Sequence, residues 1–162
     1  MSDKPMRTLS LKIMIDGSKA IEGEFGRKKF EKDIGLLSFS WSLDQLKDPT
    51  PDESSTEGKG GLVSREITFE KRTDTASALL LQHCAMGTDI KKAVLTHHTA
   101  EGKPPVYVIT LGNITISHVS HVASDHGTPQ EHFTLRFLKF HLQRGNIGYG
   151  WDCHADDEWD GQ

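Results

Sequence analysis

The feature that most constrains this chain is an alternation of apolar and polar residues with a period of two. Residues 9–15 and residues 37–43 each place a large apolar side chain at every second position. Successive side chains of a strand point to opposite faces, so both segments are predicted to be strands with one face in a core. In the second segment the intervening positions are all serine: Ser38, Ser40 and Ser42.

Further strands are expected at about residues 65–71, 90–98, 106–122 and 132–142. In the last of these the apolar positions change parity between Phe137 and Leu138, which predicts a β-bulge or a strand that passes from one sheet to another. Residues 149–152 are expected to form a short final strand. The expected organisation is one domain over residues 1–152, followed by an acidic C-terminal tail over residues 153–162.

One helix is expected, at about residues 75–86, with Asp74 as its N-cap and Gly87 as the left-handed residue after its last turn. Its two sides are both apolar, with Leu80 on one and Leu81 on the other. A helix of this kind is usually covered on both sides, here by its own sheet and by a neighbouring subunit. The expected fold class is therefore mainly β: a barrel formed from two β-sheets with one flanking α-helix.

Length and charge limit the classes of function. The chain has 162 residues, the size of one domain, and a formal net charge of −4. Nucleic-acid-binding domains usually carry a strongly basic surface, so no nucleic-acid partner is expected. The first residues lack the apolar segment of a signal peptide, and no apolar run is long enough to cross a membrane. We expect a protein made in the cytoplasm, without membrane insertion, whose export would need no signal peptide.

The nine histidines raise the question of a metal site. His97 and His98 are neighbours on an expected strand and therefore point to opposite faces, and no close pair of His or Cys has a zinc-motif spacing. No GxSxG motif is present, and Cys84 lies in the expected helix, where a small buried residue is a commoner role than a nucleophile. We predict no catalytic residue, no metal and no cofactor. A small metal-dependent enzyme that uses the histidines remains the alternative, which metal analysis of the purified protein would test.

Two features suggest contacts outside a single subunit. Residues 47–61 are rich in Pro, Gly, Ser and charged residues and cannot contribute to a core. A loop this long usually has a function, so it is either mobile or docked on something beyond its own subunit. The serines at 38, 40 and 42 form either a solvated strand face or the lining of a channel, where small uncharged hydroxyls would not obstruct a passenger.

The order of motifs resembles that of the Hcp (hemolysin-coregulated protein) family of the type VI secretion system. The resemblance covers nearly the whole chain, and its parts are specific only in combination. They are LKIMIDG at 11–17, Gly23-Glu24, LSFSW at 37–41, ITFEK at 67–71, the run from Asp74 to Gly87, YVITLGNITIS at 107–117, Pro129 with Glu131, and Gly150-Trp151-Asp152. Phe25 stands where the family has serine, and the acidic tail is not part of the family pattern.

This resemblance implies a tube subunit that is not an enzyme. Hexameric rings would stack into a hollow tube, tipped by a VgrG spike and driven out of the cell by a contractile sheath, with small protein effectors carried and protected in the lumen. Ser40, between Ser38 and Ser42, falls at a lumen position that contacts cargo. The ring-stacking residues would be those of the long loop: Lys47, Asp48, Asp52, Glu53, Glu57 and Lys59. A phage-type tail tube protein is a further alternative, which genome neighbours would distinguish.

Overall fold

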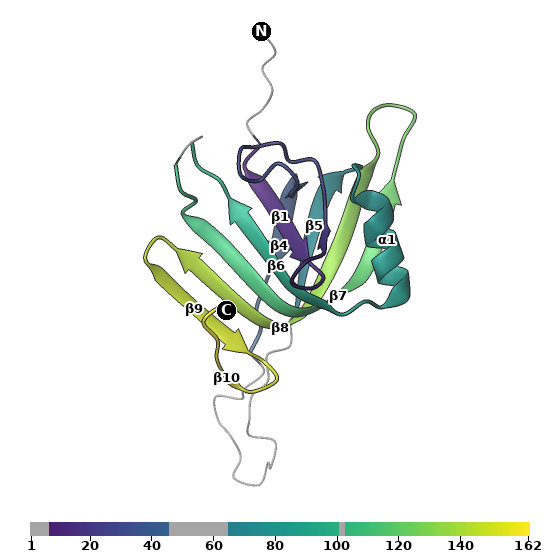
Figure 1. The fold of residues 1–162 in the computed structure, drawn as a ribbon. Coiled ribbons are helices and arrows are strands. Elements are labelled where there is room, and N and C mark those ends of the chain that lie inside the picture. The colour runs from purple at the N-terminus through teal and green to yellow at the C-terminus, as the bar shows by residue number, and fades with distance from the viewer. Residues whose placement is uncertain (1–6, 46–64, 101–102) are drawn as a thin grey trace.

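The computed structural model of the chain describes residues 7–45, 65–100 and 103–162. These residues form ten strands and one helix, so the expected mainly β class is confirmed (Figure 1). The strands are β1 (Leu9–Met14), β2 (Ala20–Ile21), β3 (Ile34–Gly35), β4 (Ser38–Trp41), β5 (Glu66–Arg72), β6 (Ile90–His97), β7 (Tyr107–Val122), β8 (Gln130–Arg144), β9 (Ile147–Asp152) and β10 (Asp157–Glu158), and the helix is α1 (Ser77–Met86).

All strand pairs are antiparallel and belong to one hydrogen-bonded network. Its main path runs β10-β9-β8-β7-β6-β1-β2, with β3 added to β1, and with β5 joining β4 to β8. The two long strands β7 and β8 run through both halves of this curled sheet, which does not close within the described residues. The arrangement is that of a barrel-like sandwich in which long strands pass from one layer to the other.

The apolar positions of β8 change parity because the strand passes from one layer of the sheet to the other, the second of the two causes predicted above. Residues 130–136 of β8 pair with β5, whereas residues 139–144 pair with β9, so the strand changes partners near Phe137. The bulge itself lies in β7, where the register against β8 shifts between Ile116 and His118. A change of layer requires apolar side chains of both parities, because each half of the strand turns a different face to the core.

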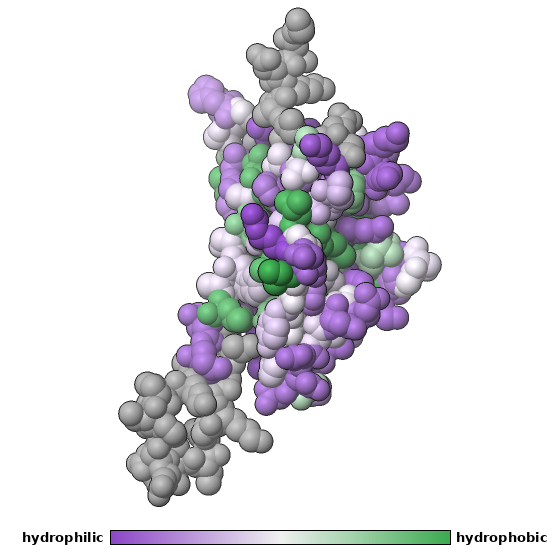
Figure 2. Space-filling model, turned by 90° about the vertical axis from the view of Figure 1, so that its left-hand side faces the viewer, coloured by the Kyte–Doolittle hydropathy of each residue, from purple (hydrophilic) through white to green (hydrophobic). Residues whose placement is uncertain are grey.

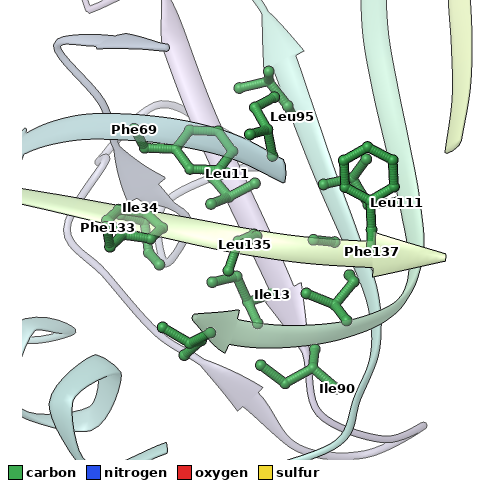
Figure 3. Packing of buried hydrophobic residues seen from close by; sticks show 14 of the residues in the cluster. Leu11, Ile13, Ile34, Phe69, Ile90, Leu95, Leu111, Phe133, Leu135 and Phe137 are labelled. Atoms are coloured by element: carbon green, nitrogen blue, oxygen red, sulfur yellow. The ribbon is translucent and has the colours of Figure 1, made fainter. Parts of the chain in front are cut away.

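The core lies between the two halves of the sheet (Figure 3). Leu11 and Ile13 of β1 face the side chains of the opposite layer, where Phe69 of β5 stacks on Phe133 of β8 with ring centroids 5.0 Å apart. At least a dozen apolar side chains in this cluster are almost completely inaccessible to solvent. Burial of this kind stabilises the fold by about 25 cal/mol per Å² of apolar surface.

Helix α1 packs against the end of β7 (Figure 1). Its N-cap is Ala76, not Asp74 as predicted, although the Asp74 Oδ1 still accepts a hydrogen bond from the Ala76 amide at 2.9 Å. Gly87 has the predicted left-handed conformation, with φ of 62°, and its amide donates to the Cys84 carbonyl. Among the described residues, no helix combines the length and apolar character that crossing a membrane requires.

The C-terminal residues expected to form a tail fold back on the sheet instead. Strand β10 pairs with the end of β9, and the Trp159 amide donates to the Gly150 carbonyl at 3.1 Å. The Lys139 ammonium lies 5.8 Å from the centre of the Trp159 ring. Gly150 permits this approach because a Cβ there would lie 2.6 Å from the Phe140 carbonyl oxygen and would also clash with the Trp159 carbonyl. Residues 152–160 therefore form a hairpin, which we call the acidic hairpin.

Candidate functional site

One side of the half-sheet β4-β5-β8-β7 carries polar side chains. We call this surface the polar face. Its members alternate with the core residues of the same strands, and β5 and β8 show the alternation most clearly. They are Ser38, Ser40, Glu66, Thr68, Glu70, Thr115, His118, Ser120, His132, Thr134 and Arg136.

Cross-strand pairing arranges the polar face in rows. One row, which we call the hydroxyl row, runs from Ser40 through Thr68 and Thr134 to His118. Each of these residues is the register partner of the next. The hydroxyls of Thr68 and Thr134 lie 3.0 Å apart and form a hydrogen bond. Side chains at such opposed positions stabilise a sheet by roughly 0.2–1 kcal/mol per pair.

The charges on the polar face are mostly paired with neighbours on the same face. The Arg136 guanidinium donates to Glu66 Oε1 through Nε at 3.1 Å and Nη2 at 2.7 Å. The Ser38 hydroxyl donates to Glu70 Oε2 at 3.2 Å. The polar face therefore presents hydroxyls, one ion pair and the Glu70 carboxylate, which accepts a hydrogen bond from Ser38.

The predicted serines are exposed. Ser38 and Ser40 lie in β4 and point away from the half-buried Phe39 and Trp41, as the alternation predicts. Ser42 is also exposed but lies beyond the end of β4, outside the paired register. The residues predicted to contribute to ring stacking, Lys47, Asp48, Asp52, Glu53, Glu57 and Lys59, lie outside the described residues.

Two histidines of the polar face were missed in the sequence. His118 ends the row that contains Thr134, its register partner, and His132 lies in the next row as the register partner of Ser120. The alternation of residues 132–142 could have placed His132, since it has the opposite parity to Phe133. His118 could not be placed, because its orientation depends on the bulge after Ile116, which has no sequence signal of its own.

A buried ionic network at the start of α1 was also missed. The Lys71 ammonium is fully buried and contacts Glu131 Oε2 at 2.9 Å and Asp74 Oδ1 at 2.7 Å. The Ser77 hydroxyl donates to Glu131 Oε2 at 2.7 Å. The buried Glu131 Oε1 accepts no hydrogen bond from the described residues, and His121 Nε2 lies 3.8 Å from it. This network joins α1 to β5 and β8 and lies on the core side, away from the polar face.

The described residues show no arrangement typical of a nucleophile or a metal. Cys84 and Cys153 are free, half-buried thiols, and burial raises the pKa of Cys153, which disfavours its reactive thiolate. Within residues 7–45, 65–100 and 103–162, no group of three or more His, Cys, Asp or Glu side chains could hold a metal ion.

Apolar side chains are also exposed elsewhere on the molecule. Figure 2 shows one face, on which hydrophobic patches lie among polar side chains. Leu81 and Met86 of α1 are 46% and 66% exposed, and Ile147 and Tyr149 of β9 are 76% and 56% exposed. Strand β10 covers only the end of β9, so Ile147 and Tyr149 lie on a stretch of strand that has no partner on its outer side among the described residues.

Comparison with known proteins identifies relatives of this architecture. Residues 11–143 match the family model described as "Type VI secretion system effector, Hcp". No curated protein matches the chain.

Solved structures with the same fold come from several bacteria. The chain is 26% identical to Hcp2 from Salmonella typhimurium, with a TM-score of 0.71, over 93% of this chain and 99% of that one. Hcp1 from the same organism is 24% identical, with a TM-score of 0.74, over 94% and 99% of the two chains. A type VI secretion system effector from Yersinia pestis is 23% identical, with a TM-score of 0.71, over 89% and 98%.

Proposed function

Because this chain belongs to the Hcp family of type VI secretion proteins, we propose that it is the structural subunit of a secretion tube and not an enzyme. The polar face carries this proposal. Its central row holds small hydroxyls, and its carboxylates are occupied by neighbours on the same face. A surface of this kind can line a channel, since it offers hydrogen bonds to a passenger and its carboxylates already accept hydrogen bonds from Ser38 and Arg136.

Closure of a hexameric ring around a lumen lined by the polar face is the second part of the proposal. A ring needs two different surfaces that meet head to tail and close on rotation. The exposed apolar side chains of α1 and the uncovered edge of β9 are suited to such contacts, since isolated apolar patches and open strand edges favour association.

The partners follow from the same proposal. Small protein effectors would bind in the lumen, where the ring protects them as a chaperone does, and Ser38, Ser40 and Ser42 would contact this cargo. Stacked rings would engage a VgrG spike and a contractile sheath, which supplies the free energy of ejection. The protein would be made in the cytoplasm and leave through the type VI system. The loop residues Lys47, Asp48, Asp52, Glu53, Glu57 and Lys59 would contribute to ring stacking.

The substitution Ser40→Gln tests the lumen assignment. Ser40 is exposed, so glutamine can replace it without disturbing the core. We expect annular particles of unchanged diameter by negative-stain electron microscopy, together with several-fold lower recovery of co-expressed effector in a pull-down. The longer side chain would narrow the lumen and displace cargo that contacts the hydroxyl row.

Ala123→Gln provides the matched control, because it adds the same side chain at an exposed position in the loop after β7, away from the polar face and from the proposed ring contacts. This variant should retain effector as the wild-type chain does. Equal effector recovery with Ser40→Gln and the wild type would refute the lumen assignment. A stable monomer at high concentration, with no annular particles, would refute the tube proposal as a whole.

A further inference from the structure

A basic pocket lies between two loops that are far apart in the sequence. It has a volume of about 700 Å³, and its described lining residues include no carboxylate. They are Arg27, Lys28, Lys29, Phe30, His98, Lys103, Pro104 and Pro105. Four permanent positive charges in one pocket attract an anionic occupant, and Phe30 with the two prolines supplies apolar walls.

Contacts of Arg27, His98 and Phe30 hold the pocket in shape, and none of them involves its lysines. The Arg27 guanidinium donates to the carbonyls of Thr99 at 3.0 Å and Arg7 at 3.1 Å, which ties one loop to the other. His98 is 5% exposed; its Nε2 lies 2.7 Å from the Ser10 hydroxyl, and Phe30 packs edge-on against its ring.

The free charges of the pocket suit anionic groups such as carboxylates. Lys28, Lys29 and Lys103 are exposed, and no ion pair of theirs exists among the described residues. Lysine is a flexible, strongly hydrated point charge that binds carboxylate and phosphate oxygens without the fixed fork geometry of arginine. The one arginine of the pocket is engaged with backbone carbonyls. Several separate lysines around apolar walls suit an acidic peptide segment.

The chain itself contains such a segment. The acidic hairpin exposes the carboxylates of Asp156, Asp157, Glu158 and Asp160. Its shape is maintained by β10 pairing with β9 and by the contact between Lys139 and Trp159. A segment that is already ordered loses less conformational entropy when it binds than a free tail would.

The basic pocket and the acidic hairpin lie at opposite ends of the subunit. In Figure 1 the segments at residues 27–30, 98–100 and 103–106 are at the top, and the turn between β9 and β10 is at the bottom. The hairpin therefore cannot reach the pocket of its own subunit. Two different surfaces at opposite ends produce a head-to-tail contact that repeats from copy to copy.

We infer that the basic pocket receives the acidic hairpin of a second copy of this chain, and that this contact joins one ring to the next. The inference rests on the proposed function, because it assumes the ring. This contact would act beside the loop residues of the proposed function. Because it is electrostatic, it would be sensitive to salt. Screening becomes strong once the Debye length falls below about 10 Å, near 0.1 M salt.

Charge reversal in the full-length chain tests this contact. Stack length would be measured by negative-stain microscopy and sedimentation velocity, at low salt and at several-fold higher salt. We expect Lys28→Glu with Lys103→Glu, and separately Asp157→Lys with Glu158→Lys, to leave rings but shorten stacks several-fold. A chain with all four substitutions should stack again, because the charges of both surfaces are exchanged.

Lys19→Glu with Lys91→Glu is the control, since both lysines are exposed and lie outside the pocket. This variant should stack as the wild type does. Unchanged stacking by either double variant, or no recovery in the fourfold variant, would overturn the inference while leaving the tube proposal intact. Absence of rings from the wild-type chain would overturn the tube proposal, and this inference with it.

Discussion

At the residue scale, the consequences of burial differ between adjacent histidines. His97 is exposed, whereas His98 is almost completely buried, as expected for neighbours on one strand. Burial lowers the pKa of His98, and the positive charges of Arg27 and His97 lower it further. His98 therefore resists protonation in the folded state at pH values where it would be protonated in the unfolded chain.

This difference predicts a pH-dependent stability. Because the pKa of His98 is lower in the folded than in the unfolded chain, His98 stabilises the fold at pH values above its unfolded pKa of about 6.5. This contribution is lost as the pH falls through the folded pKa. We expect the urea midpoint of the wild-type chain to decrease between pH 7.5 and pH 5.5. His98→Gln, which can still donate to Ser10, should show a smaller decrease.

His97→Gln serves as the control for this prediction, because it removes an exposed neighbour. It should retain most of the wild-type pH dependence, apart from the small effect of its own charge on His98. The prediction fails if His98→Gln and the wild type show the same decrease.

At the element scale, the ionic network of Lys71, Asp74 and Glu131 determines how α1 joins the sheet. Its members come from β5, from the turn before the helix and from β8. Charged groups buried in this way are tolerated only when they are paired, because removal from water costs several kcal/mol per ion. The Asp74 carboxylate is engaged by Lys71, and the helix begins two residues later than a simple N-cap predicts.

Removal of the cation should destabilise the whole domain. Lys71→Met leaves two carboxylates near each other without a counter-ion, which should cost about 3–5 kcal/mol in the free energy of unfolding, measured by urea denaturation. Adding Glu131→Gln to this variant should recover part of the loss, because one unpaired charge is removed.

Arg136→Met is the matched control, since it breaks an ion pair whose side chains are 63% and 43% exposed. Exposed pairs contribute about 0–1 kcal/mol, so this loss should be much smaller. Equal losses for Lys71→Met and Arg136→Met would show that the buried network has no special role.

At the scale of the whole molecule, the proposed ring would cover the exposed apolar side chains of α1 and β9. If subunits cover them in a ring, the folded state is stabilised by mass action, and the apparent melting temperature should rise with protein concentration. We expect the apparent melting temperature, measured by scanning calorimetry, to decrease when the protein is diluted roughly 100-fold. Leu81→Lys should weaken this dependence, because it places a charge in the covered patch.

Gln82→Lys provides the comparison at the neighbouring exposed position of α1. It should retain the concentration dependence of the wild type if Leu81 lies in a contact and Gln82 does not. A melting temperature independent of concentration in the wild-type chain would contradict assembly.

The sequence by itself determined the seven strands of four residues or more, the presence of the helix, and the outward direction of Ser38 and Ser40. These features depend on local periodicity, since a strand with one buried face must alternate. The left-handed Gly87 was equally readable, because few other residues adopt that conformation at low cost.

Only the tertiary structure decided which distant residues meet. Lys71 and Glu131 are sixty positions apart in the sequence, and nothing in the sequence around either one distinguishes it from a charged residue on the surface. The same holds for the pocket lined by residues 27–30, 98 and 103–105, and for the acidic hairpin, whose composition resembles that of a free tail. Local pattern cannot report these contacts, because pairing across a sheet depends on the register and bulges of strands that are remote in the chain.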